Sequence, residues 1–453
     1  MDPAIFKAYD IRGIYPTQIN EDTVAKIGYF YVKFTKVINI CVGRDIRISS
    51  PILFEHFVKG ALLAGAKVTD LGVIATDMVY FATAKYGFDG GVQITASHNP
   101  KEYNGVKLVL RDAKPLSGDS GIYAIRDLVL GSANQKFDYP ASIDGIEKLD
   151  IKDDYINHVL SFVDKDKIKG LKVVIDAGNG IAGTILPDVF SHLGCELIPL
   201  YFEPDGNFPN HQAEPLDEEN VKDLEKLVVE RHADLGVAYD GDADRCFFID
   251  EKGGYSTGYF ITAMLAKNIL KNHPGEKIIH DPRQIWAIED TINSMGGVSI
   301  ISKAGHAFIK ERMRQENAIF AGELSSHFYF RENYYADNGM IPMLMMLEHI
   351  ITERKPLSQL LAYYRSKYFA SPEINYKVSD VSKILAHVEE HYKDKASRIY
   401  HIDGLSVDFL NWRFNLRGSN TEPLIRLNAE AKSQEILDKQ LKEVESVITS
   451  EEF

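Results

Sequence analysis

Short apolar segments, each followed by glycine or polar residues, recur from the N-terminus to the segment Ser366–Pro372. Longer segments between them have the apolar spacing of amphipathic helices. This alternation predicts α/β domains, in which ligands bind at the carboxyl ends of the strands. The predicted strands that precede the most polar loops are Ile38–Val42, Gly91–Thr95, Leu171–Ile175, Leu235–Tyr239, Lys277–His280 and Ala318–Ala321.

Chain length and three polar breaks predict four domains. With 453 residues, the chain is too long for one ordinary core. Beyond the last break, a helical segment (Val381–Tyr392), β-rich runs and a final helix from Ser433 predict a small α+β domain. The breaks are Gly131–Ile151, Glu251–Gly254 and Ser366–Pro372. The predicted domains are 1–148, 149–253 and 254–367, all α/β with mixed sheets, and 368–453, α+β.

Composition narrows the functional classes. The net charge is −14 and no block of lysine and arginine occurs, which argues against nucleic acid as a partner. The three cysteines, Cys41, Cys195 and Cys246, are too few and scattered for a disulfide framework or a zinc site. The first residues lack the features of a signal peptide, and no apolar stretch is long enough to span a bilayer. We therefore expect a reduced, cytoplasmic protein without a membrane partner.

The segment Thr95–Pro100 (TASHNP) follows a predicted strand directly. Pro100 restrains the residue before it, so we expect a tight polar loop that holds Ser97 exposed. His98 and Lys107 could manage protons or charge on such an oxygen nucleophile. An ordinary turn with helix-capping residues is the alternative.

The segment Asp240–Arg245 (DGDADR) also follows a predicted strand. In an extended segment, Asp240, Asp242 and Asp244 would point the same way. Two charges about 4 Å apart repel by roughly 4 kcal/mol at an effective dielectric constant near 20, so three carboxylates need a cation or protonation. Oxygen ligands favour Mg²⁺, Mn²⁺ or Ca²⁺ over zinc. Arg245 could orient a phosphoryl group or balance the acids, and an acidic solvated turn is the alternative.

Two later loops carry weaker signals. Gly322–His327 (GELSSH) offers a carboxylate, hydroxyls and an imidazole that could bind vicinal sugar hydroxyls, although a capped strand end is equally plausible. Arg417–Pro423 (RGSNTEP) offers a guanidinium, side-chain donors and free backbone N–H groups, which suit a phosphate. An ordinary loop between strands is the alternative.

The segment Gly178–Gly183 fits the dinucleotide pattern G-x-G-x-x-G, after a predicted strand and before a helix. The acidic residue that should follow about 20 positions later is met only loosely, by Glu203 or Asp205. A NAD-dependent dehydrogenase would also leave the Ser97 and Asp240 loops without a role.

Together with Lys7–Gly13 (KAYDIRG) and Tyr103–Lys107 (YNGVK), the four polar loops occur in an order that resembles the α-D-phosphohexomutase superfamily. The likeness runs the length of the chain and is greatest to the bacterial phosphomannomutase/phosphoglucomutase branch. It implies four domains around a central cleft, the first three built alike, each donating one loop.

The resemblance also implies a mechanism and a set of site residues. Ser97 would carry a phosphoryl group and exchange it with a hexose phosphate through a hexose 1,6-bisphosphate, which is both primer and intermediate. Mg²⁺ would be bound by Ser97, Asp240, Asp242 and Asp244. The implied catalytic residues are Ser97, His98, Lys107, Arg12, Arg245, His306 and His327. The implied substrate-binding residues are Tyr9, Arg283, Glu323, Ser325, His327, Arg417, Ser419, Asn420 and Thr421.

Two positions depart from the branch: Ala243 and Ser326 stand where glycine is usual. The Glu-Leu-Ser core is closer to the Glu-Met-Ser of mannose and glucose mutases than to the Glu-Gln-Ser of phosphoglucosamine mutases. We expect a mutase of mannose and/or glucose phosphates, as a monomer or small homo-oligomer. The alternatives are phosphoglucosamine mutase or another sugar-phosphate mutase, a dehydrogenase, and a non-catalytic sugar-phosphate-binding protein.

Overall fold

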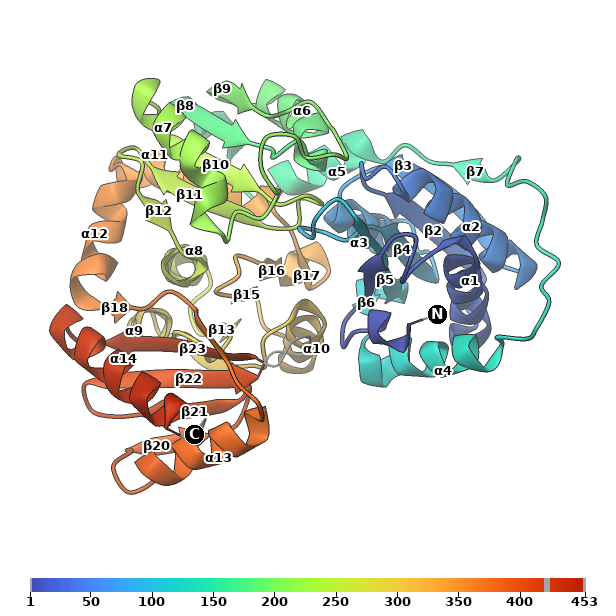
Figure 1. The fold of residues 1–453 in the computed structure, drawn as a ribbon. Coiled ribbons are helices and arrows are strands. Elements are labelled where there is room, and N and C mark those ends of the chain that lie inside the picture. The colour runs from blue at the N-terminus through green and yellow to red at the C-terminus, as the bar shows by residue number, and fades with distance from the viewer. Residues whose placement is uncertain (1, 419–423, 451–453) are drawn as a thin grey trace. The chain divides into compact units, whose positions relative to one another are not determined.

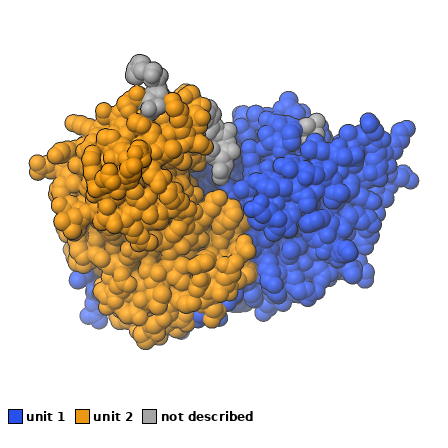
Figure 2. Space-filling view, turned by 90° about the horizontal axis from the view of Figure 1, so that it is seen from below, with its two compact units in different colours: residues 1–256, 327–357 blue, residues 257–326, 358–453 orange. Residues whose placement is uncertain are grey.

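The computed structural model describes residues 2–418 and 424–450 (Figure 1). The chain divides into two compact units, shown in different colours in Figure 2. Unit 1 comprises Met1–Ser256 and His327–Leu357, and unit 2 comprises Thr257–Ser326 and Ser358–Phe453. The third predicted domain is thus shared between the units, and the four predicted domain boundaries stay predictions.

The first sheet of unit 1 has the strand order β1-β5-β4-β2-β3-β7, with β6 paired to β5. Strands β3, β2 and β4 are parallel, whereas β5 runs antiparallel to β4 and β1, so the sheet is mixed. Its strands are β1 (Ile11–Ile14), β2 (Asn39–Arg44), β3 (Lys67–Val73), β4 (Gly90–Ile94), β5 (Tyr103–Leu110), β6 (Lys114–Pro115) and β7 (Glu147–Lys148). The accompanying helices are α1 (Glu21–Thr35), α2 (Ser50–Leu63), α3 (Thr76–Lys85) and α4 (Tyr123–Gly131).

The second sheet of unit 1 has the order β12-β11-β10-β8-β9. Strand β8 is parallel to β9 and β10, and β10 forms an antiparallel hairpin with β11. The strands are β8 (Lys169–Asp176), β9 (Gly194–Leu200), β10 (Leu235–Tyr239), β11 (Cys246–Asp250) and β12 (Tyr255–Ser256). The helices are α5 (Lys152–Leu160), α6 (Leu186–Ser191) and α7 (Lys222–Glu230). The predicted metal loop is therefore the turn of a buried hairpin.

The glycine-rich segment after β8 is closely packed. A Cβ atom on Gly183 would lie 2.2 Å from the Phe202 carbonyl oxygen. The Ile181 N–H donates to the carbonyl of Gly241 at 3.2 Å, so it is already used within the protein. The segment leads into a short 3₁₀ turn, Ile181–Thr184, and not into the long helix of a dinucleotide-binding unit. This packing disfavours the dehydrogenase alternative.

Unit 1 also contains an antiparallel pair, β16 (Phe328–Phe330) and β17 (Ala336–Asp337), followed by helix α11 (Met340–Glu353). Asn338 lies two residues before this helix and pairs its first turn, because its side-chain oxygen accepts from the N–H groups of Met340 and Ile341, both at 2.8 Å. The helix is rich in buried apolar residues. Within residues 2–418 and 424–450, every helix is too short or too polar to cross a membrane.

Unit 2 combines three parallel strands with the C-terminal sheet. The parallel strands, in the order β14-β13-β15, are β13 (Lys277–His280), β14 (Val298–Ile301) and β15 (Phe320–Gly322). The helices in this part of the unit are α8 (Gly258–Asn272), α9 (Trp286–Ser294), α10 (His306–Glu316) and α12 (Leu357–Lys367). The positions of β13 and β15 agree with the predicted strands Lys277–His280 and Ala318–Ala321 to within two residues.

The C-terminal sheet has the order β18-β23-β22-β21-β20, with β19 paired to β23, and its pairs are antiparallel. Its strands are β18 (Phe369–Ala370), β19 (Ile374–Lys377), β20 (Arg398–Tyr400), β21 (Leu405–Asp408), β22 (Trp412–Gly418) and β23 (Leu424–Ala431). Helices α13 (Val381–Tyr392) and α14 (Gln434–Thr449) share one apolar core with these strands. Ser433 begins α14 by accepting from the Ile436 N–H. The predicted fold class, with mixed α/β sheets and a C-terminal α+β domain, is confirmed.

Candidate active site

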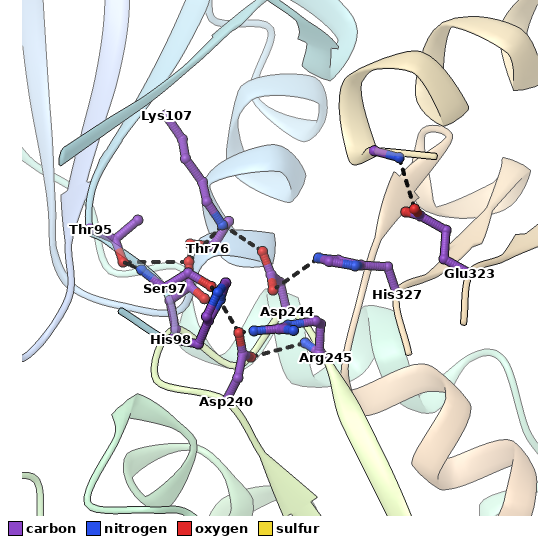
Figure 3. A network of polar contacts seen from close by, with 12 residues as sticks. Thr76, Thr95, Ser97, His98, Lys107, Asp240, Asp244, Arg245, Glu323 and His327 are labelled. Atoms are coloured by element: carbon purple, nitrogen blue, oxygen red, sulfur yellow. Dashed lines mark hydrogen bonds and ion pairs between the residues drawn. The ribbon is translucent and has the colours of Figure 1, made fainter. Parts of the chain in front are cut away.

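Ser97 lies three residues after the end of β4, in a loop that folds over its own backbone. The Thr95 hydroxyl oxygen accepts from the Ser97 N–H at 2.9 Å, and the Ser97 φ angle is +52°. A non-glycine residue in this left-handed region is strained, and such residues cluster at functional sites. The Ser97 hydroxyl donates to Asp240 Oδ2 at 2.9 Å, and its oxygen lies 3.2 Å from His98 Nδ1 (Figure 3).

The expectation that Ser97 is exposed was wrong, since only 3% of its surface is accessible. The turn Asp240–Arg245 of the neighbouring hairpin covers it. A Cβ atom on Gly241 would lie 2.5 Å from the Ser97 carbonyl oxygen, so only glycine permits this approach.

Arg47 holds the Ser97 loop from within the protein and was not singled out by its sequence context. Its guanidinium donates to four carbonyl oxygens of the loop and the following strand. These are Ser97 at 2.7 Å, Asn99 at 2.6 Å, Pro100 at 2.8 Å and Tyr103 at 3.0 Å. Arg47 Nε also lies 3.2 Å from Asp45 Oδ2. The loop shape therefore depends on one buried cation.

The three carboxylates Asp240, Asp242 and Asp244 converge, each at most 1% exposed. Each offers an oxygen within 4.8 Å of the others, so the group could hold a metal ion. The reason given from the sequence was wrong, because the segment is a compact turn and not extended. The Ala243 N–H donates to the Asp240 carbonyl, and the Ala243 φ angle is +62°.

Two cations offset part of this buried negative charge. Lys107 Nζ lies 2.7 Å from Asp242 Oδ2 and 2.6 Å from Asp244 Oδ2, and Arg245 Nε donates to Asp240 at 2.9 Å. Burial raises the pKa of Asp240 well above its ordinary value, against the opposing effect of Arg245. Burial and Asp244 oppose ionisation of Asp242, but Lys107 holds its pKa below the ordinary value.

The donor set fits a hard divalent cation. Asp242 Oδ1 is buried and makes no hydrogen bond to the part of the chain that the structure describes. A cation is the partner that such a carboxylate oxygen lacks. A second group, Asp244, His327 and Asp337, also has ligand atoms within 4.8 Å of one another, and it shares Asp244 with the first.

Further predicted residues surround Ser97 in unit 1, and together with the three aspartates they form the transfer cluster. Arg12 donates to Asp10 at 2.7 Å, to the Ala96 carbonyl at 3.2 Å and to Asn99 Oδ1 at 2.7 Å. His327 Nε2 lies 3.8 Å from Asp244 Oδ1. Tyr9 is half-buried, just before β1. The members of the transfer cluster are Arg12, Ser97, His98, Lys107, Asp240, Asp242, Asp244, Arg245 and His327.

Glu214 joins two members of the transfer cluster and was missed in the sequence. Its carboxylate lies 3.3 and 3.4 Å from the terminal nitrogens of Arg245, and 3.1 Å from His98 Nε2. Nothing in the sequence around it differs from an ordinary acidic loop, so only the tertiary contact reveals it.

The remaining predicted site residues that the structure describes lie in unit 2. Several of them form a second group with neighbouring charged residues, which we call the anion cluster. Glu323 Oε2 accepts from the Gly305 N–H at 2.8 Å, next to His306 at the start of α10 (Figure 3). Arg283 donates twice to Asp281, which in turn accepts from the Leu324 N–H at 2.8 Å. The anion cluster comprises Asp281, Arg283, His306, Glu323, Glu373, Arg417 and Arg426.

Asp281 links the predicted sugar loop to Arg283. Although burial opposes ionisation, the Arg283 guanidinium lowers the pKa of Asp281 to about 2. Arg413 holds this segment from the C-terminal sheet by donating to the carbonyls of Pro282 and Arg283 at 2.9 and 3.0 Å.

The loop that carries Glu323 turns at Ser326, whose φ angle is +63° and whose N–H donates to the Glu323 carbonyl. Serine thus occupies a left-handed position that favours glycine. Ser325 is half-buried in this loop. The predicted phosphate-binding residues Ser419, Asn420 and Thr421 lie outside the described residues.

Comparison with known proteins agrees with this arrangement. The models for phosphoglucomutase/phosphomannomutase alpha/beta/alpha domains I, II and III match residues 3–134, 153–254 and 257–368, and that for the C-terminal domain matches 373–447.

Similar proteins are phosphomutases. A protein of Xanthomonas campestris named "Phosphohexose mutases" is 44% identical over 432 residues, which cover 95% of this chain and 96% of that protein. A Salmonella typhimurium phosphomannomutase is 43% identical and covers 94% of each chain. The crystal structure of a Burkholderia thailandensis phosphoglucomutase/phosphomannomutase family protein has a TM-score of 0.89 and 30% identity over 99% of this chain and 98% of that one. The chain therefore belongs to the phosphoglucomutase/phosphomannomutase family of phosphoryl-transferring mutases.

Proposed function

We propose that this chain interconverts hexose 6-phosphate and hexose 1-phosphate, of mannose and/or glucose, through phosphorylated Ser97 and a hexose 1,6-bisphosphate. The observation that carries the proposal is the hydrogen bond between the Ser97 hydroxyl and Asp240, inside a cluster of three carboxylates and several cations. A phosphoserine carries −1.5 to −2 charges, so it needs such cations around it. Phosphoryl transfer depends mainly on positioning and on neutralising oxygen charge.

The roles of the transfer cluster are inferred from its contacts. Ser97 carries the phosphoryl group, and Arg12 and Arg245 orient its oxygens. Lys107 keeps its positive charge, because Asp242 and Asp244 raise its pKa against the effect of burial. His98 and His327, together with His306 of the anion cluster, are the candidate proton carriers. Asp240, Asp242, Asp244 and the Ser97 oxygen would bind Mg²⁺, which when bound neutralises charge on the phosphoryl oxygens.

The roles of Tyr9 and of the predicted residues in unit 2 are those that the family resemblance implies. Glu323 and Ser325 bind sugar hydroxyls, and Arg283 and Tyr9 contact the substrate. Arg417, with Ser419, Asn420 and Thr421, binds the phosphate that is not reacting.

The free state of all three cysteines supports a cytoplasmic location.

The preferred sugar is tested by coupled assays on mannose 1-, glucose 1- and glucosamine 1-phosphate. We expect turnover of mannose or glucose phosphate to exceed that of glucosamine phosphate. A strong preference for glucosamine 1-phosphate would favour the phosphoglucosamine mutase alternative.

The phosphoenzyme is tested by intact mass and peptide mapping of the purified chain, before and after incubation with glucose 1,6-bisphosphate. We expect one phosphate, on Ser97, after incubation. A chain that turns over substrate but never carries this phosphate would contradict the proposal.

Glu214→Gln should lower kcat/KM for hexose 1-phosphate about tenfold, because Arg245 and His98 lose the carboxylate that orients them. Glu225→Gln is the matched control, since Glu225 pairs with Lys222 on α7 and contacts no member of the transfer cluster in the described chain. Steady-state kinetics and thermal midpoints measure both variants. An unchanged kcat/KM in Glu214→Gln would show that Arg245 needs no such support.

A further inference from the structure

Arg417 and Arg426 lie directly opposite each other on the antiparallel strands β22 and β23. Like charges at directly opposed positions destabilise a sheet, so this pair needs a compensating anion. Each Nε atom is buried and donates no hydrogen bond to residues 2–418 or 424–450. Two arginines with donors left over are suited to binding an oxyanion.

Glu373 supplies the compensating charge. Its carboxylate lies 3.0 Å from Arg417 Nη2, 3.3 Å from Arg426 Nη1 and 4.0 Å from Arg283 Nη1. Its side chain is 23% exposed. Although burial opposes ionisation, the arginines lower the pKa of Glu373, so it is charged at neutral pH. Asp403, 3.7 Å from Arg417, is a more distant second anion.

We propose that Glu373 is the built-in counter-ion of the phosphate-binding arginines and that it weakens their hold on phosphate enough for release. The inference rests on the proposed function, in which Arg417 binds the non-reacting phosphate. A bisphosphate intermediate must be held and then let go so that its other phosphate can react. Arginines without Glu373 would bind a phosphate dianion more tightly and release it more slowly.

Glu373→Gln tests this, because it removes the charge and keeps the shape. Inorganic phosphate is the probe, titrated by calorimetry at fixed ionic strength. We expect its Kd to fall about tenfold, since one compensating charge is lost beside the bound dianion. Without phosphate the variant should melt at a lower temperature than the parent, and phosphate should close that gap. With hexose 1-phosphate, both KM and kcat should fall.

Two further variants complete the test, and a third replaces Glu373→Gln if that variant does not fold. Arg417→Gln should weaken phosphate binding, which locates the probe at these arginines. Glu389→Gln is the matched control, since Glu389 pairs with His401 on the surface of the same unit. If Glu373→Gln does not fold, Glu373→Asp, which withdraws the carboxylate by one methylene, should still bind phosphate more tightly than the parent.

An unchanged or raised Kd for phosphate in Glu373→Gln, or in Glu373→Asp if that variant is used, would overturn the proposal, as would full phosphate affinity in Arg417→Gln. Mutase turnover of the parent is assayed separately. Its absence would remove the proposed function, whereas the phosphate titration would still decide the role of Glu373.

Discussion

Ser97→Ala should lower kcat for hexose phosphate interconversion by about 10⁴-fold or more, because it removes the one hydroxyl of the transfer cluster, which would carry the phosphoryl group. The fold should tolerate the change, because the lost hydroxyl donates one hydrogen bond, to Asp240, worth about 1 kcal/mol. The variant should also stay unphosphorylated after incubation with glucose 1,6-bisphosphate. Coupled kinetics, thermal midpoints and intact mass measure the three effects.

Ser132→Ala is a matched control for this loss. Ser132 is also buried, at 3% exposure, and its hydroxyl donates to the Val129 carbonyl at the end of α4. Its removal should leave both turnover and phosphorylation unchanged. Retention of more than a tenth of the turnover in Ser97→Ala would mean that phosphate reaches the sugar without this serine.

The positions of the polar loops were predictable from the sequence, because each follows an apolar strand whose end is marked by glycine or polar residues. Leu235–Tyr239 and Lys277–His280 were predicted with the bounds that the structure shows. The need of Asp240, Asp242 and Asp244 for nearby positive charge was also predictable, since three ionised carboxylates so close together cannot stay buried without cations.

The supporting residues were not predictable, because their partners are far away in sequence. Arg47 contacts a loop 50 positions later, and Glu214 contacts Arg245 31 positions later. Glu373 contacts Arg417 44 positions later. No local pattern marks such residues. Burial of Ser97 was missed for the same reason, since the loop that covers it begins at Asp240, 143 positions away.

Arg47→Met should cause the largest loss of stability among these changes and should also lower activity. The guanidinium is 1% exposed, and methionine fills similar space but makes none of its contacts. Four loop carbonyls would lose their donor, and the carboxylate of Asp45 would stay buried without its cation. Breaking a buried ion pair in this way lowers the free energy of unfolding by about 3–5 kcal/mol. The loss should be measured on the part of unit 1 that unfolds together with this loop.

Activity should also fall, because Arg47 fixes the position of Ser97. Displacement of a reacting group by about 1 Å can cost about 10²-fold in rate, so kcat/KM should fall by that order even where the variant is folded. Arg47→Lys separates charge from geometry. Lysine keeps the positive charge beside Asp45, but its ammonium cannot reach four carbonyls at once. It should therefore recover more of the stability than of the activity.

Arg44→Met provides the matched comparison, three residues earlier in the same segment. Arg44 pairs with Asp70 at 2.8 Å, with side chains 19% and 10% exposed, and lies over the Phe54 ring; within the described residues its guanidinium makes no hydrogen bond or ion pair with the Ser97 loop. Its loss should cost less than that of Arg47, because it removes one ion pair and one ring contact and leaves the backbone carbonyls of the Ser97 loop paired. Denaturant unfolding and steady-state kinetics on the three variants decide the matter. Equal effects of Arg47→Met and Arg44→Met would mean that the Ser97 loop keeps its shape without the buried guanidinium.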